Sequence, residues 1–335
     1  MIHPGTTTKG FLMGTFRKHV SKANKSKLKE ESAAFNNLSE SFDPSMVVTA
    51  NIPMIPKRES GIISQPRASS ILKSCLRQHI LGTVYQCRIE KYVPFRDRVT
   101  FGLGDAIHYW VQNTPWLFPD DRRVGWWFCR ACEKTRLFGI RPTTKCENCG
   151  ASSSACEYQE HGMEIKQKVK VRYVNRKTNK VDTKLVTIPV VSGHMDLFLA
   201  KDTYPALRVN ELKSISSKQF PDLKAPLADH EHQVITYMEY LNQDPNMPAP
   251  VDDQVGYVTY ISKRHDFKNI PIKMFAVENK GPVAERIAEK VKLYVRGLKH
   301  FPDHLAPPVG ECERNHFGNY RAKHCPVRED CMRYL

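Results

Sequence analysis

Residues 193–213 read GHMDLFLAKDTYPALRVNELK, and the acids and the lysine in this stretch decide the predicted fold. The pattern predicts two consecutive strands, over residues 193–200 and 207–213. Asp196 belongs to the first of them and meets the second if the two strands pair. The sequence therefore predicts a sheet in which acidic side chains gather on neighbouring strands.

The segment Glu211-Leu-Lys213 places an acid and a lysine two residues apart. Side chains two apart in a strand point the same way, so Glu211 and Lys213 are predicted to project together towards Asp196. Two carboxylates and a scissile phosphate coordinate Mg²⁺ or Mn²⁺, which prefer oxygen ligands. The metal activates water, and Lys213 positions or deprotonates that water or stabilises the developing negative charge. This chemistry predicts phosphodiester hydrolysis.

Two helical segments add polar side chains to this site. The segment Gly104-Asp-Ala-Ile-His108 ends in an imidazole that is a further candidate ligand, because imidazole tolerates Mn²⁺ well. The segment Gln233-Val-Ile-Thr-Tyr237 places its first and last side chains four residues apart, on one helix face. From that face, Gln233 and Tyr237 are predicted to reach the DNA backbone or the active-site carboxylates.

Hydrophobic periodicity assigns the other elements of a mixed α/β (α+β) fold. Apolar residues at helical spacing predict helices, and alternating segments predict strands. Helices are predicted over residues 70–81, 102–112, 230–241 and 282–299, the last opened by a proline. Strands are predicted over residues 166–174, 184–191, 254–262 and 272–277, with a hairpin loop over 175–180 joining the first two.

A cysteine-rich insert is predicted over residues 126–156. It holds Cys129-Arg-Ala-Cys132 and, 13 residues later, Cys146-Glu-Asn-Cys149-Gly150. Two Cys-x2-Cys knuckles at this spacing are typical of a tetrahedral zinc ribbon, and the glycine suits the tight turn of the second knuckle. The alternative is two unrelated pairs of cysteines. Cys156 is predicted to take no part in the site.

The charge balance favours a polyanionic partner. Lys and Arg number 51 and Asp and Glu number 35, which gives a net charge of +16. A basic folded body suggests nucleic acid, most simply DNA, although a generically basic soluble protein would show the same excess. The side chains of the insert that are compatible with DNA contact are Trp126, Trp127, Arg130, Lys134 and Arg136.

The chain divides into a tail and one main domain. Residues 1–62 are polar and basic and are predicted to form a disordered tail or linker. Residues 63–335 are predicted to form the domain, with a cysteine-rich C-terminal segment over 305–335. No apolar run approaches the ~20 residues of a membrane helix, and the N-terminus lacks the pattern of a secretory signal. The protein is therefore predicted to be cytoplasmic, with no membrane partner.

The four polar segments, in this order, give the chain a resemblance to the RecB-like nucleases of the PD-(D/E)xK superfamily. Over about residues 70–335 it is most similar to the iron–sulfur exonucleases of CRISPR systems, of the bacterial AddAB helicase–nuclease and of phages. The resemblance implies a restriction-endonuclease-like core with a mixed central sheet flanked by helices. It also implies that His108, Asp196 and Glu211 are metal ligands and that Lys213 is the catalytic lysine. Gln233 and Tyr237 would match the accessory motif of the family.

The same resemblance implies an iron–sulfur cluster, because those nucleases join one early cysteine to three late ones. The matching residues are Cys75, Cys312, Cys325 and Cys331, whose four thiolates could hold a 4Fe–4S cluster. The chain departs from the family in the 12 residues between Cys312 and Cys325, a gap that is typically much shorter. Cys87 or His324 is therefore an alternative ligand, and a second zinc site or free thiols are alternatives to the cluster.

The predicted function is a divalent-metal-dependent DNA nuclease, with an exonuclease acting on single strands as the leading form. A phage origin is expected, which would place the activity in the host cytoplasm, in DNA recombination or repair. No helicase motif is present, so unwinding requires a helicase partner, and a recombinase or single-strand-binding protein is a further candidate partner. The alternatives are a non-catalytic zinc-ribbon DNA-binding or adaptor protein on a nuclease scaffold, and a redox-sensing iron–sulfur protein.

Overall fold

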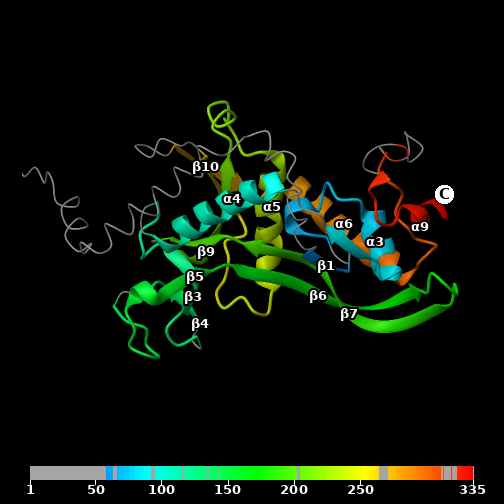
Figure 1. Ribbon diagram of the computed structural model, residues 1–335, viewed down its shortest axis with the longest axis horizontal. Helices are drawn as coiled ribbons and strands as arrows, with labels where there is room; N and C mark the ends of the chain where they lie inside the picture. Colours follow the sequence, from blue (N-terminus) through cyan, green and yellow to red (C-terminus); the bar gives the residue numbers. More distant parts are fainter. Residues whose placement is uncertain are drawn as a thin grey trace, which may run out of the picture. The chain divides into compact units, whose positions relative to one another are not determined.

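A mixed sheet lies at the centre of the fold (Figure 1). Its strands are β3 (Arg123–Cys129), β4 (Arg136–Ile140), β5 (Cys156–Gln159), β8 (Leu197–Lys201), β9 (Tyr204–Ile215), β10 (Val255–Ser262) and β11 (Ile272–Glu278). Among the described residues the strand order is β11-β10-β9-β8-β3-β4, and β5 also pairs with β3. Strands β9 and β10 are parallel, whereas the other neighbours in this sheet are antiparallel.

The structure, a computed structural model, describes residues 58–62, 66–91, 95–114, 117–133, 136–142, 144–201, 204–263, 271–310, 312, 318 and 323–334. These residues belong to one unit, residues 57–335. The predicted basic tail, residues 1–62, lies outside the described residues except for strand β1 (Arg58–Ile62), which pairs with β2 (Arg88–Lys91).

Helices cover both faces of the central sheet. The described helices include α3 (Leu76–Val84), α4 (Phe95–Asn113), α5 (Ala228–Tyr240), α6 (Gly281–Lys299) and α9 (Arg328–Met332), with 3-10 turns η1 (Ala68–Ser70), η2 (Ser153–Ala155) and η3 (Leu241–Gln243). Leu197 and Leu212 belong to a hydrophobic cluster with Val111 of α4, whereas Phe198 and Val209 belong to the larger cluster that includes α5. Alternate strand residues face opposite sides, so β8 and β9 bury apolar side chains on both. The predicted mixed sheet flanked by helices is confirmed.

A long hairpin leaves this sheet, formed by β6 (His161–Val174) and β7 (Val181–Met195). The hairpin turn lies where the sequence predicts it: the N–H of Asn175 donates to the carbonyl of Lys180 at 3.0 Å, and Asn179 adopts a φ of 54°. The pairing shifts by one residue between Ile165 and Lys166, opposite Pro189. Proline cannot donate a ladder hydrogen bond, so within a strand it is found at such irregularities.

Helices α3 and α6 lie along one face of the hairpin (Figure 1). Helix α6 buries Ile287, Val291, Tyr294 and Leu298, which recur every three or four residues and form one apolar stripe. Its Tyr294 hydroxyl forms a hydrogen bond of 3.1 Å with the hydroxyl of Thr83 in α3. Fully burying one such apolar side chain contributes about 1.5–3 kcal/mol, so the stripe is a principal attachment of α6 to the fold.

Three predicted elements are wrong in detail. The predicted helix over residues 102–112 starts too late, since α4 begins at Phe95. The predicted strand over residues 193–200 is interrupted, because β7 ends at Met195 and β8 begins at Leu197. The predicted helix over residues 70–81 starts too early, since α3 begins at Leu76 and Cys75 is its N-cap residue. Serine hydroxyls compete for backbone groups ahead of this helix, as Ser74 donates to the carbonyl of Ile71 at 3.2 Å.

No helix among the described residues combines the length and the apolar character needed to cross a membrane.

Candidate active site and metal centres

Asp196 is the single residue between β7 and β8, and only 6% of its surface is exposed. Its Oδ2 accepts a hydrogen bond from the backbone N–H of Leu212 at 2.8 Å, which ties it to β9. On the same strand, Lys213 donates from Nζ to Oε1 of Glu211. The strand pairing therefore brings Asp196, Glu211 and Lys213 into one site, as their spacing predicts.

Glu160 is a member of this site that the sequence analysis missed. It is the single residue between β5 and β6, just as Asp196 is the single residue between β7 and β8. The hairpin pairs His161 with Met195. One residue further from the hairpin turn, the same pairing puts Glu160 beside Asp196. Without the one-residue shift at Ile165, the register of the hairpin would set Gln159 there instead. The sequence could have located Glu160 only through the predicted hairpin. Its strand pairing would have to be continued as far as residue 160, with the one-residue shift taken into account.

Helix α4 supplies the remaining side chains. His108 lies with Nδ1 3.6 Å from Oδ1 of Asp196. One turn later, Gln112 donates from Nε2 to the backbone carbonyl of Asp196 at 2.8 Å and to Oε1 of Glu160 at 3.2 Å. Residues four apart share a helix face, so α4 presents both polar groups to the same pair of acids.

Burial and mutual repulsion set the charge states of the acids. Burial raises the pKa of Glu211 well above its usual value, and the nearby charge of Asp196 raises it further. Burial followed by repulsion from Asp196 also raises the pKa of Glu160. Burial acts in the same direction on Asp196, but the hydrogen bond and charge of His108 outweigh it, so its pKa is lowered. Asp196 is therefore the most readily ionised acid of the three.

The two cationic groups respond to the same carboxylates. Burial lowers the pKa of Lys213, but the charges of Glu211 and Asp196 outweigh it, and the pKa ends above its usual value. Burial likewise lowers the pKa of His108, but its hydrogen bond to Asp196 and the charge of that acid raise the pKa overall. Lys213 is consequently an ammonium group at neutral pH.

Gln233 and Tyr237 lie within the protein and do not reach outward to a DNA backbone. Tyr237 is 1% exposed, and its hydroxyl donates to the backbone carbonyl of His194 at 2.5 Å. Gln233 donates from Nε2 to the Tyr237 hydroxyl at 3.1 Å. A Cβ at Gly193 would lie 2.8 Å from the Tyr237 ring, so the glycine leaves room for the tyrosine. The two residues position the chain next to Asp196.

The donor set fits a divalent cation. One ligand atom from each of His108, Glu160 and Asp196 lies within 4.8 Å of the others. One imidazole nitrogen and two carboxylate oxygens suit Mn²⁺ or Mg²⁺. Glu211 borders this group: its Oε1 is held by Lys213, while its Oε2 is buried without a hydrogen-bond partner among the described residues. An unpaired buried carboxylate oxygen is costly unless a cation or donor satisfies it.

The four cysteines of the insert meet at one point. Sulfur atoms of Cys129, Cys132, Cys146 and Cys149 all lie within 4.8 Å of one another, and those of Cys129 and Cys149 are 3.7 Å apart. Tetrahedral zinc with Zn–S bonds of about 2.3 Å requires sulfur atoms about 3.8 Å apart. The spacing therefore suits a metal such as zinc.

The two knuckles have the same backbone geometry. The residue after each second cysteine is left-handed, with φ of 53° at Glu133 and 71° at Gly150. Each of these residues donates its N–H to the carbonyl of the first cysteine of its knuckle, at 2.9 Å to Cys129 and 2.8 Å to Cys146. The predicted tight turn at Gly150 is confirmed.

One predicted DNA contact in the insert is wrong. Trp127 is 2% exposed and donates its indole N–H to the carbonyl of Gly139 at 3.0 Å, so it is a core residue. Trp126 is partly buried and donates to Nδ1 of His161 at 3.1 Å. Arg130 is exposed and pairs with Glu157. Lys134 and the side chain of Arg136 lie outside the described part of the chain.

A second group of cysteines gathers near the C-terminus. Burial raises the pKa of the Cys325 thiol to about 11, and the nearby thiols of Cys75, Cys331 and Cys312 raise it too. The same neighbours Cys75 and Cys312 act on Cys331, whose pKa burial also raises. A cubane cluster spaces its sulfur ligands more widely than a single tetrahedral ion does. The four predicted ligands are therefore neighbours, although 256 positions separate Cys75 from Cys331.

The alternative ligands lie in other surroundings. Cys87 is buried, and its sulfur accepts a hydrogen bond from Nη2 of Arg176 at 2.8 Å. His324 has an exposed side chain. Arg77 of α3 is buried and donates to the carbonyls of Cys331 at 3.0 Å and Tyr334 at 2.8 Å. It holds the end of the chain against α3 beside Cys75.

Comparisons with known proteins add no identification. No protein-family model matches the chain, and no curated protein matches it. A solved structure described as "Crystal structure of SSO0001" aligns with 84% of this chain and 91% of that chain, at 13% identity and a TM-score of 0.30. A likeness this slight supports no argument about fold or activity.

We expect Cys146→Ser to remove zinc from the protein as purified, because the sulfur set loses one of four ligands. The measurement is metal content by elemental analysis, together with the melting temperature, which should fall. Cys156→Ser is the matched control, since Cys156 is buried beside the group but is not one of the four. Full zinc in the Cys146 variant, or loss of zinc in the Cys156 variant, would contradict the assignment.

We expect Glu160→Gln to weaken Mn²⁺ binding by at least about tenfold, because an anionic oxygen of the donor set becomes a neutral amide. Titration calorimetry with Mn²⁺ on the zinc-loaded protein measures this. Glu164→Gln is the control, as Glu164 lies four residues further along, on β6, and pairs with Lys166 at 2.7 Å. Equal Mn²⁺ affinity in the Glu160 variant and the unaltered protein would remove Glu160 from the site.

Proposed function

We propose that this protein is a divalent-metal-dependent deoxyribonuclease. The observation that carries the proposal is the meeting of His108, Glu160 and Asp196 beside the buried Glu211 and its partner Lys213. A bound Mg²⁺ or Mn²⁺ would activate water and offset charge on a phosphate under attack. A site of oxygen and nitrogen ligands with an adjacent lysine is suited to that chemistry.

The protein groups around the ion have separate tasks. Asp196, with its lowered pKa, provides a carboxylate at neutral pH, and Gln112 fixes its backbone and the side chain of Glu160. His108 adds a neutral nitrogen once it gives up its proton, so ligand binding and proton release are coupled. Glu211 completes the acidic side of the site and holds the lysine in place.

Lys213 is better suited to stabilise charge than to remove a proton. The two carboxylates beside it outweigh burial and keep its pKa above the usual value, so it remains an ammonium group. An ammonium donor orients an attacking water molecule and stabilises the negative charge that develops on the phosphate oxygens. Of the roles that the sequence leaves open for this lysine, orientation and charge stabilisation fit its surroundings.

Within this proposal, exonucleolytic cleavage of single-stranded DNA is the leading form. It is supported by the resemblance of the four polar segments to RecB-like nucleases and by the net charge of +16. The zinc site of the ribbon and a 4Fe–4S cluster at Cys75, Cys312, Cys325 and Cys331 are proposed as structural centres. A phage source and a helicase or recombinase partner belong to the same proposal.

We expect Lys213→Ala to lower the cleavage rate by about 10² to 10⁴-fold, because the site loses its ammonium group. The assay follows end-labelled single- and double-stranded DNA, with free and blocked ends, in Mn²⁺ and in Mg²⁺. Lys218→Ala is the control, since Lys218 is exposed in the turn after β9. Zinc content and DNA binding should be unchanged in both variants. Cleavage by Lys213→Ala at the unaltered rate, or no cleavage by any form, would reject the nuclease and favour a non-catalytic DNA-binding protein.

We expect protein purified without oxygen to be coloured, with the broad visible absorption of an iron–sulfur cluster. Cys325→Ser should abolish the colour, because one of the four proposed thiolate ligands is lost. Cys87→Ala should retain it, since the Cys87 sulfur contacts Arg176. A colourless protein that contains two zinc ions would instead identify a second zinc site.

A further inference from the structure

Two cavities open along the β6 strand, and none of the candidate active-site residues lines either of them. The first, of about 320 Å³, lies between Gln167 of β6 and the last turns of α6. The second, of about 400 Å³, lies between the tip of the hairpin and the C-terminal residues. His300 lines the first cavity, and the next residue along the chain, Phe301, lines the second. Both lie within the size range of ligand sites.

The first cavity is cationic. Lys292, Arg296 and Lys299 line it from one face of α6, since they are four and three residues apart. All three are exposed, and none forms an ion pair with a described residue. Among the described residues, no carboxylate lines this cavity. An anion would be attracted here over the range of a Debye length.

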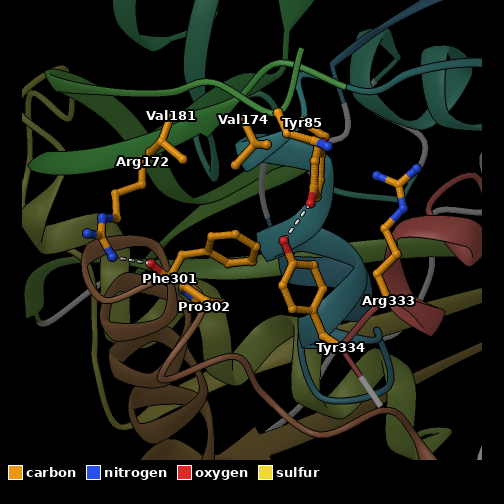
Figure 2. A pocket seen from close by; sticks show the side chains of 9 residues that line it. Tyr85, Arg172, Val174, Val181, Phe301, Pro302, Arg333 and Tyr334 are labelled. Carbon is orange, nitrogen blue, oxygen red and sulfur yellow. Dashed lines mark hydrogen bonds between the residues drawn. The ribbon is translucent and has the colours of Figure 1, made fainter. Parts of the chain in front are cut away.

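The second cavity combines aromatic and cationic walls (Figure 2). The hydroxyls of Tyr85 and Tyr334 form a hydrogen bond of 2.6 Å, and Phe301 packs edge-on against both rings. Arg172 lies on the opposite side and donates to the backbone carbonyl of Phe301 at 2.7 Å. A carbonyl does not neutralise the guanidinium, so Arg172 keeps its charge. In the described part of the chain, no carboxylate lines this second cavity either.

Arg333 adds a further positive charge to the second cavity. Its guanidinium lies 3.7 Å from Asp330, but the same carboxylate also pairs with Arg176. Asp330 is thus shared between two guanidinium groups, and Glu329 also acts on Arg176. Val174 and Val181 supply an apolar part of the cavity wall.

We propose that the two cavities together form a binding trough for single-stranded nucleic acid. Phosphates occupy the cation-lined cavity on α6, and an unstacked base enters the aromatic cavity beside Tyr334. In single-stranded nucleic acid, anionic phosphates alternate with flat, apolar bases. The trough offers a matching cationic cavity and aromatic cavity. An acidic peptide matches the cations alone, and a duplex keeps its bases stacked inside the helix.

Strand β6 connects the trough with the candidate active site. It begins at His161, next to Glu160, and carries Arg172 at its far end. The trough does not depend on cleavage, because its cations and rings bind without a divalent metal. It would hold a strand away from the metal site whether or not the chain cuts DNA.

The experiment measures binding of a labelled oligothymidylate by fluorescence anisotropy, with no added divalent cation, between about 50 and 200 mM salt. We expect Arg296→Ala/Lys299→Ala to bind more weakly and to make the slope of log K against log salt shallower by about 1.4, for two lost phosphate contacts. Arg286→Ala is the matched control, because Arg286 is an exposed cation of α6 that lines neither cavity. Its salt slope should equal that of the unaltered protein.

The aromatic cavity is tested separately. Tyr334→Ala should weaken binding about tenfold, because one base loses its stacking partner. Tyr334→Phe keeps the ring and should bind as the unaltered protein does. An unchanged salt slope in the double variant, equal binding of a duplex, or equal competition by an acidic peptide would each overturn the proposal. Loss of cleavage with binding intact would count against the proposed nuclease alone.

Discussion

The burial of several carboxylates at one point is the constraint on which the site depends. Asp196 and Glu211 are 6% and 2% exposed, and Glu160 is half-buried beside Asp196. Like charges in a medium of low dielectric constant repel strongly, so such a group persists only where cations or donors offset it. His108, Lys213 and the N–H of Leu212 partly do so. A divalent cation held by His108, Glu160 and Asp196 would offset charge that remains.

The register of the β6–β7 hairpin delivers one of those carboxylates. The pairing shifts by one residue opposite Pro189, and this shift sets Glu160 rather than Gln159 beside Asp196. A shift of one residue exchanges the faces of a strand, so the irregularity decides which side chain enters the site. The same strand carries Arg172 to the trough. One hairpin thus joins the carboxylate site to the proposed nucleic-acid surface.

Each of the two cysteine groups lies beside contacts that join different elements of the fold. Strand β3 pairs with β8 at Arg123 and ends at Cys129, so the ribbon continues the central sheet. Arg123 is fully buried and donates to the carbonyl of Gln112 at 2.6 Å, which links the strand to α4. At the other group, Arg77 holds the C-terminal residues on α3. Metal-held sulfurs at these points would reinforce contacts between distant parts of the chain.

The sequence by itself determined the features that depend on local spacing. Helical and alternating periodicities located most elements, the two-residue spacing predicted the Glu211–Lys213 pair, and the two knuckles predicted the sulfur group and the turn at Gly150. Only the tertiary structure decided the position of Glu160 beside His108 and Asp196, the burial of Trp127 and the inward position of Tyr237. These depend on strand register and on packing between segments far apart in the chain, and periodicity within one segment carries no information about either.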